Sequence, residues 1–154
     1  MPHLGISTNR GRFDKKTGTV QLDKTGRSAR VDITIETASI STGTAAFDQH
    51  LRGKDFFNSA DFPTARFVAD NFRFDGDKVA EVRGNLTLLG KTLPVQLKAT
   101  RFACTMHPVL TVEVCGGDFE TAIQRSQWGM SWGLTFGISD NVRLVVQVEG
   151  LKPT

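Results

Sequence analysis

The chain has 154 residues, of which 39% are hydrophobic and 23% charged, a composition typical of a globular domain and not of a disordered chain. Lys and Arg exceed Asp and Glu by only 19 to 16, and because the two signs are interleaved we expect no nucleic-acid partner. Apolar runs extend over a few residues only, so we expect no integral membrane segment. The length predicts one domain over residues 1–154.

Apolar and polar residues alternate with a period of two along most of the chain, which is typical of strands with one buried face. In one example, Val31, Ile33 and Ile35 alternate with polar neighbours. We expect eight antiparallel strands, near residues 6–13, 17–23, 29–37, 65–74, 78–89, 93–104, 109–123 (with a bulge at Gly116-Gly117) and 141–150. Between the fourth and fifth, Asp75-Gly76-Asp77 predicts a tight hairpin turn.

Residues 44–57 depart from this alternation. Their apolar positions, Ala46, Phe47, Leu51 and Phe56-Phe57, predict a short helix flanked by loops. Eight antiparallel strands with one apolar face form either a sandwich or a barrel, and the local pattern does not distinguish the two. An eight-stranded barrel is either filled by side chains or holds one small ligand.

Gly129-Met130-Ser131-Trp132-Gly133 matches the G-x-S-x-G motif of hydrolases. In that motif a helix follows the serine, and an acidic residue and then a histidine come later in the chain. Here every histidine precedes Ser131, and the residues after it are rich in glycine and then β-patterned. Asp48, His50, Arg52 and Asp55 share the predicted helix, where charged residues usually form the solvated face. We therefore predict no catalytic residue.

The only two cysteines, Cys104 and Cys115, allow three interpretations. If the residues between them form a hairpin, they face each other within reach of a disulfide. They could instead be reduced thiols, or bind a metal with His107 and the nearby Asp118. No fourth ligand occurs at a standard spacing, so we predict no metal site and favour the disulfide.

Arg125 also has two interpretations. The planar guanidinium suits an anionic headgroup, but an arginine near a strand end is more commonly a loop anchor. The eleven phenylalanines are equally ambiguous, because they fit both a filled core and an apolar cavity.

Seven segments, in order along nearly the whole chain, carry a family resemblance. They are His3-Leu4-Gly5, Arg10-Gly11-Arg12-Phe13-Asp14, Ser39-Ile40-Ser41-Thr42-Gly43, Asp48-Gln49-His50-Leu51-Arg52-Gly53-Lys54-Asp55-Phe56-Phe57, Phe62-Pro63-Thr64-Ala65-Arg66-Phe67, Gly84-Asn85-Leu86-Thr87-Leu88-Leu89-Gly90 and Ile123-Gln124-Arg125-Ser126-Gln127-Trp128-Gly129-Met130. Together they resemble the YceI-like family of polyisoprenoid-binding proteins.

This resemblance implies an all-β, lipocalin-like antiparallel barrel with a short helical insertion. It also implies a hydrophobic tunnel that holds an isoprenoid quinone, a polyprenyl phosphate or a fatty-acid-like lipid, without catalysis or another cofactor. Export to the periplasm of a Gram-negative bacterium is implied as well. The segment from Cys104 to Phe119 is similar to one subgroup of the family, which strengthens the disulfide interpretation.

The pattern of apolar residues then suggests which side chains contact the lipid. We expect the tunnel to be lined by Leu4, Phe13, Ile33, Phe56, Phe57, Phe67, Leu86, Phe102, Trp128, Met130 and Phe136. We expect His50 and Arg125 at its rim.

Members of the family usually begin with a signal peptide and a first strand before the segment that resembles His3-Leu4-Gly5. Because this sequence starts at that segment, we expect an open sheet edge, and hence a homodimer or a strand-exchanged assembly. The alternative function is a fully packed barrel that binds a protein partner through the Trp- and Met-containing rim at residues 127–132.

Overall fold

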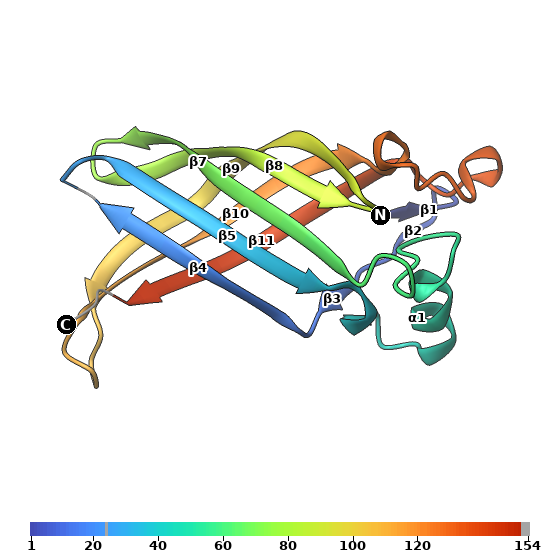
Figure 1. Cartoon of the computed structure of the whole chain (residues 1–154), viewed down its shortest axis with the longest axis horizontal. Helices are drawn as coiled ribbons and strands as arrows, with labels where there is room; N and C mark the ends of the chain where they lie inside the picture. Colours follow the sequence, from blue (N-terminus) through green and yellow to red (C-terminus); the bar gives the residue numbers. More distant parts are fainter. Residues whose placement is uncertain (24, 152–154) are drawn as a thin grey trace.

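One curled antiparallel sheet forms most of the molecule. The computed structural model describes residues 1–23 and 25–151, and its seven-stranded sheet has the order β11-β10-β9-β8-β7-β5-β4. The strands are β4 (Lys16–Asp23), β5 (Ser28–Glu36), β7 (Thr64–Asp75), β8 (Lys78–Leu88), β9 (Lys91–Met106), β10 (Glu113–Gln124) and β11 (Asn141–Leu151). The sheet curls into a half-barrel that carries β4 and β11 toward each other (Figure 1). The prediction of an all-β, barrel-like fold is confirmed.

The smaller elements gather at one end of this half-barrel (Figure 1). Two short strand pairs lie there, β1 (Pro2–His3) with β2 (Ser7–Thr8) and β3 (Arg12–Phe13) with β6 (Ile40–Ser41). The helical elements are α1 (Ala45–Arg52) and three 3₁₀ turns, η1 (Thr37–Ser39), η2 (Arg125–Trp128) and η3 (Leu134–Phe136). The helical insertion expected near residues 44–57 is thus confirmed, with α1 occupying its first half.

The strand predicted over residues 6–13 is wrong. Leu4 and Gly5 have positive φ angles of 53° and 70°, so the chain turns sharply and β2 pairs back onto β1. The Ile6 amide donates to the His3 carbonyl at 3.1 Å and closes this turn. Farther on, β3 pairs with β6 outside the main sheet. The main sheet therefore has seven strands where the alternation predicted eight.

The bulge predicted at Gly116-Gly117 is also misplaced. Both glycines keep regular pairing with β9, and the register shifts at Asp118 and Phe119. Thr100 on β9 is the unpaired residue there, and its hydroxyl donates to the Asp118 carbonyl at 3.2 Å. The glycines serve close approach instead, because a Cβ added to Gly117 would lie 2.6 Å from the Arg101 carbonyl oxygen.

The hairpin turns mostly follow their sequence signals. Asp75 pairs with Lys78, and Gly76 has a φ of 63° in the two-residue turn between β7 and β8, which confirms that prediction. The strand predicted to start at residue 109 starts only at Glu113. Pro108 and its neighbours form a tight turn at this point, since proline cannot donate to a strand ladder.

The apolar side chains form two clusters. The first, which we call the sheet core, lies inside the curl and contains Ala69, Val79, Val82, Leu86, Val95, Leu97, Phe119, Ile123 and Trp128. The second, which we call the end cluster, joins the helical insertion to the sheet. It contains Ile40, Leu51, Phe56 and Met130, with Phe13, Phe47, Phe57 and Leu89 packed against them. The end cluster closes the end of the half-barrel that carries α1.

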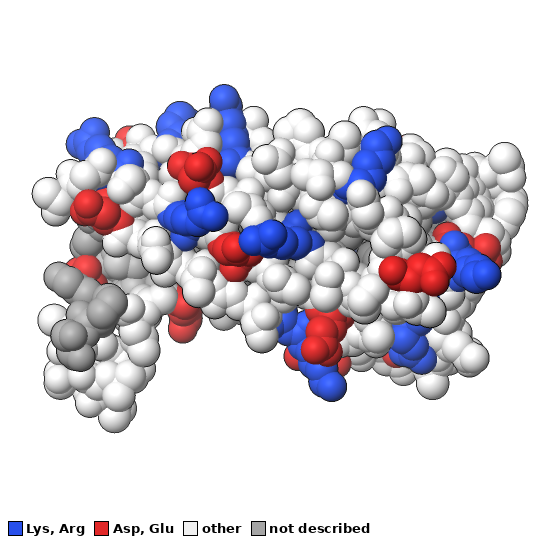
Figure 2. Space-filling view, in the orientation of Figure 1, with Lys and Arg blue, Asp and Glu red and all other residues white. Residues whose placement is uncertain are grey.

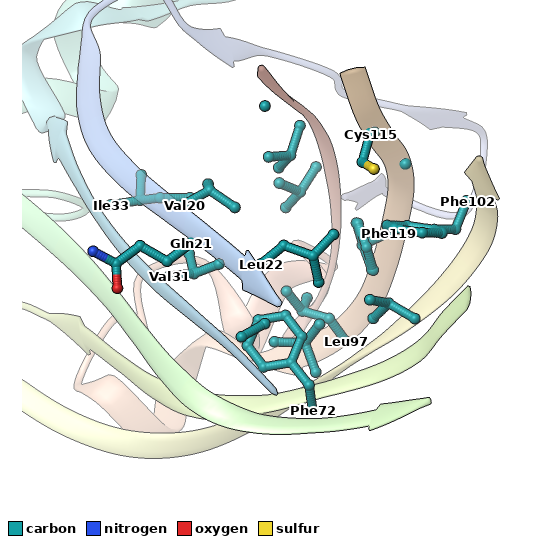
Figure 3. A pocket seen from close by; sticks show the side chains of 18 of the residues that line it. Val20, Gln21, Leu22, Val31, Ile33, Phe72, Leu97, Phe102, Cys115 and Phe119 are labelled. Atoms are coloured by element: carbon teal, nitrogen blue, oxygen red, sulfur yellow. The ribbon is translucent and has the colours of Figure 1, made fainter. Parts of the chain in front are cut away.

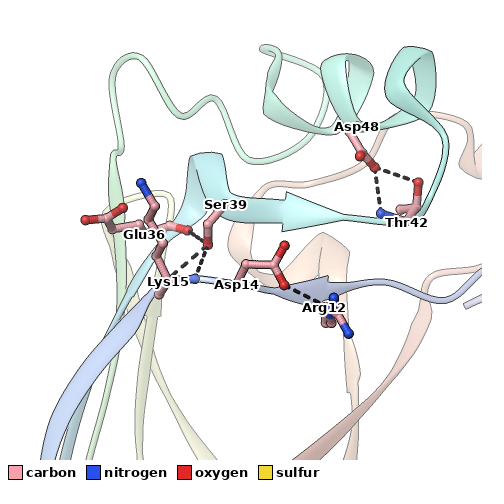
Figure 4. A network of polar contacts seen from close by, with 7 residues as sticks. All are labelled: Arg12, Asp14, Lys15, Glu36, Ser39, Thr42 and Asp48. Carbon is pink, nitrogen blue, oxygen red and sulfur yellow. Dashed lines mark hydrogen bonds and ion pairs between the residues drawn. The ribbon is translucent and has the colours of Figure 1, made fainter.

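Polar contacts fasten the chain around this closed end (Figure 4). The Ser39 hydroxyl donates to the Glu36 carbonyl at 2.7 Å and accepts from the Lys15 amide at 3.0 Å. Asp48 on α1 accepts from both the amide and the hydroxyl of Thr42, at 2.8 and 2.6 Å. The Ser39 bonds join η1 to the end of β5 and to the residue before β4, and the Asp48 bonds join α1 to the residue after β6.

Candidate functional site: a cavity inside the half-barrel

The inside of the curled sheet encloses a cavity of about 410 Å³. Strands place alternate side chains on one face, so each of the seven strands contributes apolar side chains to its wall (Figure 3). The apolar lining consists of Val20, Leu22, Ala29, Val31, Ile33, Phe67, Phe72, Val79, Val82, Leu97, Phe102, Phe119, Val146, Val148 and Leu151. The sheet therefore surrounds an apolar hollow and not a fully packed core.

Polar residues line the cavity mainly at the end away from α1, which we call the polar end. Asp23 is the last residue of β4, Thr25 lies two positions later, and Glu113 is the first residue of β10. Leu151, the last residue of β11, lines the same end. The cavity is thus amphiphilic, with an apolar length and carboxyl and hydroxyl groups near one end.

Cys104 and Cys115 form a disulfide close to the polar end. They are directly paired between β9 and β10, with 4.0 Å between their Cα atoms, and Cys115 lines the cavity. The preferred interpretation of the cysteines is confirmed. His107 takes part in the turn instead of a metal site, because its Nδ1 accepts from the amides of Val109 and Leu110. Residues 1–23 and 25–151 contain no group of three side chains suited to a metal ion.

Three of the predicted lipid contacts, Ile33, Phe67 and Phe102, line the cavity. Leu86 and Trp128 lie in the sheet core instead. There the Trp128 indole donates to the Leu86 carbonyl at 3.0 Å, which satisfies its only donor and fixes the ring.

The remaining predicted lining residues lie at the closed end. Phe13, Phe56, Phe57 and Met130 belong to the end cluster. Within it, the rings of Phe13 and Phe57 meet edge to face with 5.3 Å between centroids. Leu4 and Phe136 are about half exposed, at 50% and 55%. None of these six side chains lines the cavity.

His50 lies on the surface of the same end. Its Nε2 is 3.1 Å from an Asp55 carboxylate oxygen, and its ring meets those of Phe56 and Trp132 edge to face. Trp132 is 37% exposed, whereas Trp128 and Met130 are buried. Of the large apolar residues in the rim considered for a protein partner, residues 127–132, only Trp132 is exposed.

Arg125 is the most deeply buried charged residue that the structure describes, with 2% of its surface exposed. Its guanidinium donates to the carbonyls of Ser139, Met130 and Ile138 at 2.9, 2.9 and 3.2 Å. The Phe56 ring lies under it, with 5.7 Å to the centroid. Burial lowers the pKa of Arg125, and the charge of Asp140 opposes that shift. This environment makes Arg125 an anchor of the η2–η3 segment.

Ser131 lies between the 3₁₀ turns η2 and η3. The hydrolase motif instead requires a strand, a sharp turn and an α-helix. The glycines that flank Ser131, Gly129 and Gly133, both have positive φ angles, of 88° and 82°. They are needed for these turns.

Most of the residues that line the cavity are not among the predicted lipid contacts. Val20 and Leu22 on β4, and Val146 and Val148 on β11, line it without belonging to any recognisable motif. Their signal was the period-two alternation itself, because residues separated by two positions share a face of the sheet. Parity along each strand identifies the lining better than the identity of the large aromatic residues.

Comparison with known proteins places this geometry in context. A family model described as a YceI-like domain matches residues 1–150. Protein YceI of Salmonella arizonae is 35% identical over 151 residues, covering 97% of this chain and 78% of that protein. No helix within residues 1–23 and 25–151 is long and apolar enough to span a membrane.

Two solved structures share the fold. The YceI protein of Campylobacter jejuni aligns with a TM-score of 0.81 at 24% identity, over 100% of this chain and 91% of that one. A polyisoprenoid-binding domain from Saccharophagus degradans, implicated in plant cell wall breakdown, aligns with a TM-score of 0.61 at 15% identity. That alignment covers 93% of this chain and 85% of that one.

Proposed function

The chain belongs to the YceI-like family, and from this premise we propose that it binds a polyisoprenoid or similar long-chain amphiphilic lipid without transforming it. The observation that carries the proposal is the apolar cavity of about 410 Å³ inside the half-barrel. Each methylene transferred from water into such a cavity contributes ~0.8 kcal/mol. The polyisoprenoid-binding domain of Saccharophagus degradans has the same fold and supports the choice of ligand class.

The residues at the polar end of the cavity indicate which lipid headgroup the site favours. Asp23 and Glu113 are carboxyl residues, and Thr25 is a neutral hydroxyl donor. An anionic headgroup close to the Asp23 carboxylate is repelled, whereas a neutral one can accept a hydrogen bond from the Thr25 hydroxyl. Among an isoprenoid quinone, a polyprenyl phosphate and a fatty-acid-like lipid, we therefore favour the quinone. Apolar walls discriminate one methylene by only ~1–3 kcal/mol, so tail length should matter little.

We also propose a periplasmic location and a role in storing or carrying the lipid. The disulfide between Cys104 and Cys115 supports an oxidising compartment, because disulfides persist there and are rare in the cytosol.

The test is lipid retention by the purified protein, read by organic extraction and mass spectrometry. Ala29 lines the cavity from β5, and its neighbour Arg30 is exposed and outside the lining. Ala29→Trp should fill the hollow and abolish retention of a prenylated quinone, whereas Arg30→Trp, the matched control, should retain it. Circular dichroism checks that both variants keep the sheet. Equal retention by the two variants would refute the proposal.

A second pair of variants tests the part of the wall that the edge strand β11 contributes. Val148 lines the cavity and Gln147 does not. Because an unpaired carboxylate in an apolar site is strongly unfavourable, Val148→Asp should release the lipid and Gln147→Asp should not. The same assay with a polyprenyl phosphate tests the headgroup, since binding tighter than that of the quinone would contradict our choice.

A further inference from the structure

The turn between β9 and β10 projects beyond the half-barrel at its polar end (Figure 1). We call residues 106–112 the hairpin tip. Three large apolar side chains in it point into solvent: Met106 is 63% exposed, Val109 80% and Leu110 52%. Exposing three such side chains on so short a segment is unfavourable in water, and such patches mark interaction sites.

The hairpin tip has no charged side chain. The eleven residues from Phe102 to Val112 include no Asp, Glu, Lys or Arg. Charges of both signs, in contrast, are spread over the body of the sheet (Figure 2). No charged side chain of the hairpin tip itself would therefore have to leave water if the tip entered an apolar medium.

The backbone of the tip satisfies its own amides. The His107 amide donates to the Val112 carbonyl at 2.7 Å, and the Thr111 amide donates to the His107 carbonyl at 3.0 Å. The amides of Val109 and Leu110 both donate to His107 Nδ1, at 3.2 and 3.0 Å. Pro108 has no amide hydrogen. Every N–H from His107 to Thr111 thus has an internal acceptor, which lowers the cost of moving this backbone to a lipid interface.

The tip is also held in place close to the cavity. The disulfide joins β9 and β10 at its base, and Glu113 and Cys115, which follow it, line the polar end. At the other end of the molecule, Ile6, Leu4 and Phe136 are exposed too. There the end cluster packs beside α1, and the ion pair Arg12–Asp14 and the polar pair His50–Asp55 lie nearby.

From these observations we propose that the hairpin tip inserts Met106, Val109 and Leu110 into the surface of a phospholipid bilayer and so presents the polar end of the cavity to the membrane. The uncharged tip with satisfied amides fits a lipid interface better than a protein partner, whose contact surface normally has a polar rim. Docking rests on the tip alone. Only the passage of a lipid through this contact rests on the proposed function.

A tryptophan probe tests the insertion directly. In Leu110→Trp, the added fluorescence should shift to the blue with phosphatidylcholine vesicles and be quenched by brominated phosphatidylcholine. Ile6→Trp, which places the same probe at the closed end, should show neither change. Because no charge takes part, binding should be unaffected by raised salt. Quenching of Ile6→Trp alone, or of neither probe, would overturn the proposal.

A vesicle sedimentation assay gives a second, independent test. Val109→Asp with Leu110→Asp should weaken binding to phosphatidylcholine vesicles at least about tenfold, because two carboxylates would replace apolar side chains at the interface. Val145→Asp, at a site that is 67% exposed on β11, is the matched control and should bind like the parent protein. Unchanged binding by the double variant would overturn the proposal.

Light scattering without vesicles tests whether the hairpin tip binds a second copy of the chain instead of a membrane. A dimer of the parent protein that the double variant abolishes would assign the tip to self-association and overturn the membrane proposal. Lipid retention by the double variant should equal that of the parent protein, because neither residue lines the cavity. If the parent protein itself retains no lipid, the proposed function is contradicted, whereas the result on membrane docking is unaffected.

Discussion

Arg125 is a buried charged residue whose guanidinium is stabilised by hydrogen bonds to backbone carbonyls. Three carbonyl oxygens, those of Met130, Ile138 and Ser139, accept from its guanidinium. The planar fork of arginine reaches all three at once, whereas lysine offers a single ammonium on a flexible stem. The position thus depends on the shape of the group as well as on its charge.

We predict that Arg125→Lys lowers the free energy of unfolding by about 2–4 kcal/mol, because it leaves buried carbonyls without a donor. Urea denaturation measures this loss. Arg143→Lys, at an exposed arginine paired with Glu120, is the control and should change stability by less than about 0.5 kcal/mol. Similar losses in the two variants would contradict the anchoring role of Arg125.

Asp140 supports the same segment. The Ser126 hydroxyl and then the Ser126 amide donate to its carboxylate, at 2.7 and 2.8 Å, and together with the charge of Arg125 they hold the pKa of Asp140 below its usual value. A carboxyl with a lowered pKa stabilises the folded state above its unfolded value of about 3.9, and this contribution is lost as the pH falls through the folded pKa.

We therefore expect Asp140→Asn to reduce stability near neutral pH, and the difference from the parent protein to shrink progressively as the pH falls below about 4. Asp77→Asn, in the exposed turn between β7 and β8, is the matched control. Urea denaturation over a series of pH values measures the difference. The pKa values of Asp32 and Glu81 are also lowered, by hydrogen bonds from Arg66 and Arg73. Because both residues are present in the parent protein and in the variant, their effect cancels in the difference. A gap independent of pH would contradict this assignment.

At the scale of elements, the β9–β10 hairpin combines the disulfide, the cavity wall and the hairpin tip. Its two cysteines are eleven residues apart in sequence. A cross-link over so short a loop restricts the unfolded chain and, in the chain-entropy model, stabilises by about 2–3 kcal/mol. The bond thus makes a sizeable part of the stability of a domain this small.

We predict that Cys104→Ala with Cys115→Ala lowers the free energy of unfolding by about 2–3 kcal/mol. The parent protein unfolded in the presence of a reductant should lose a similar amount, and the reductant should leave the variant unchanged. A parent protein insensitive to reductant would show that the disulfide does not contribute.

Strands were predictable where alternation is long and unbroken. The ranges 17–23 and 65–74 agree with β4 and β7 to within one residue at each end, because burial of one sheet face dictates the pattern. The prediction over residues 6–13 was wrong because this segment does not alternate regularly and instead contains two short strands, β2 and β3, that pair outside the main sheet. No local pattern tells which strand they will join, since pairing depends on contacts distant in sequence.

The cavity was predictable only in part. Alternation identified the inward face of β5 and β11, but it does not say where facing side chains meet and where they leave a space. Phe13 and Phe57 pack on each other, whereas Phe72 and Phe119 face the hollow. That difference depends on the curvature of the whole sheet, which is a property of the assembled strands.

For the molecule as a whole, the two edge strands of the main sheet bear on its oligomeric state. Among the described strands, β4 and β11 each pair on one side only. Unpaired strand edges readily pair with another chain, and this argues for the homodimer expected from the sequence.

We predict that light scattering after size-exclusion gives a mass twice the 16.9 kDa of one chain. Thr19→Lys on the edge strand β4 should shift the protein toward the monomer, because lysine on an edge opposes pairing. Asn71→Lys, equally exposed but on the interior strand β7, should leave the mass unchanged. A monomeric parent protein would contradict the prediction.

The incomplete pairing of the sheet has one more consequence, for the way a long molecule enters. Along the line where β4 approaches β11, the wall is made by side chains such as Val20 and Val148 without a ladder of main-chain bonds between the two strands. Separating β4 from β11 along this line breaks no backbone hydrogen bond between the two strands. Under the proposed function, we therefore expect a long hydrocarbon chain to enter from the side, between β4 and β11. A lipid longer than the cavity would then not have to enter end first.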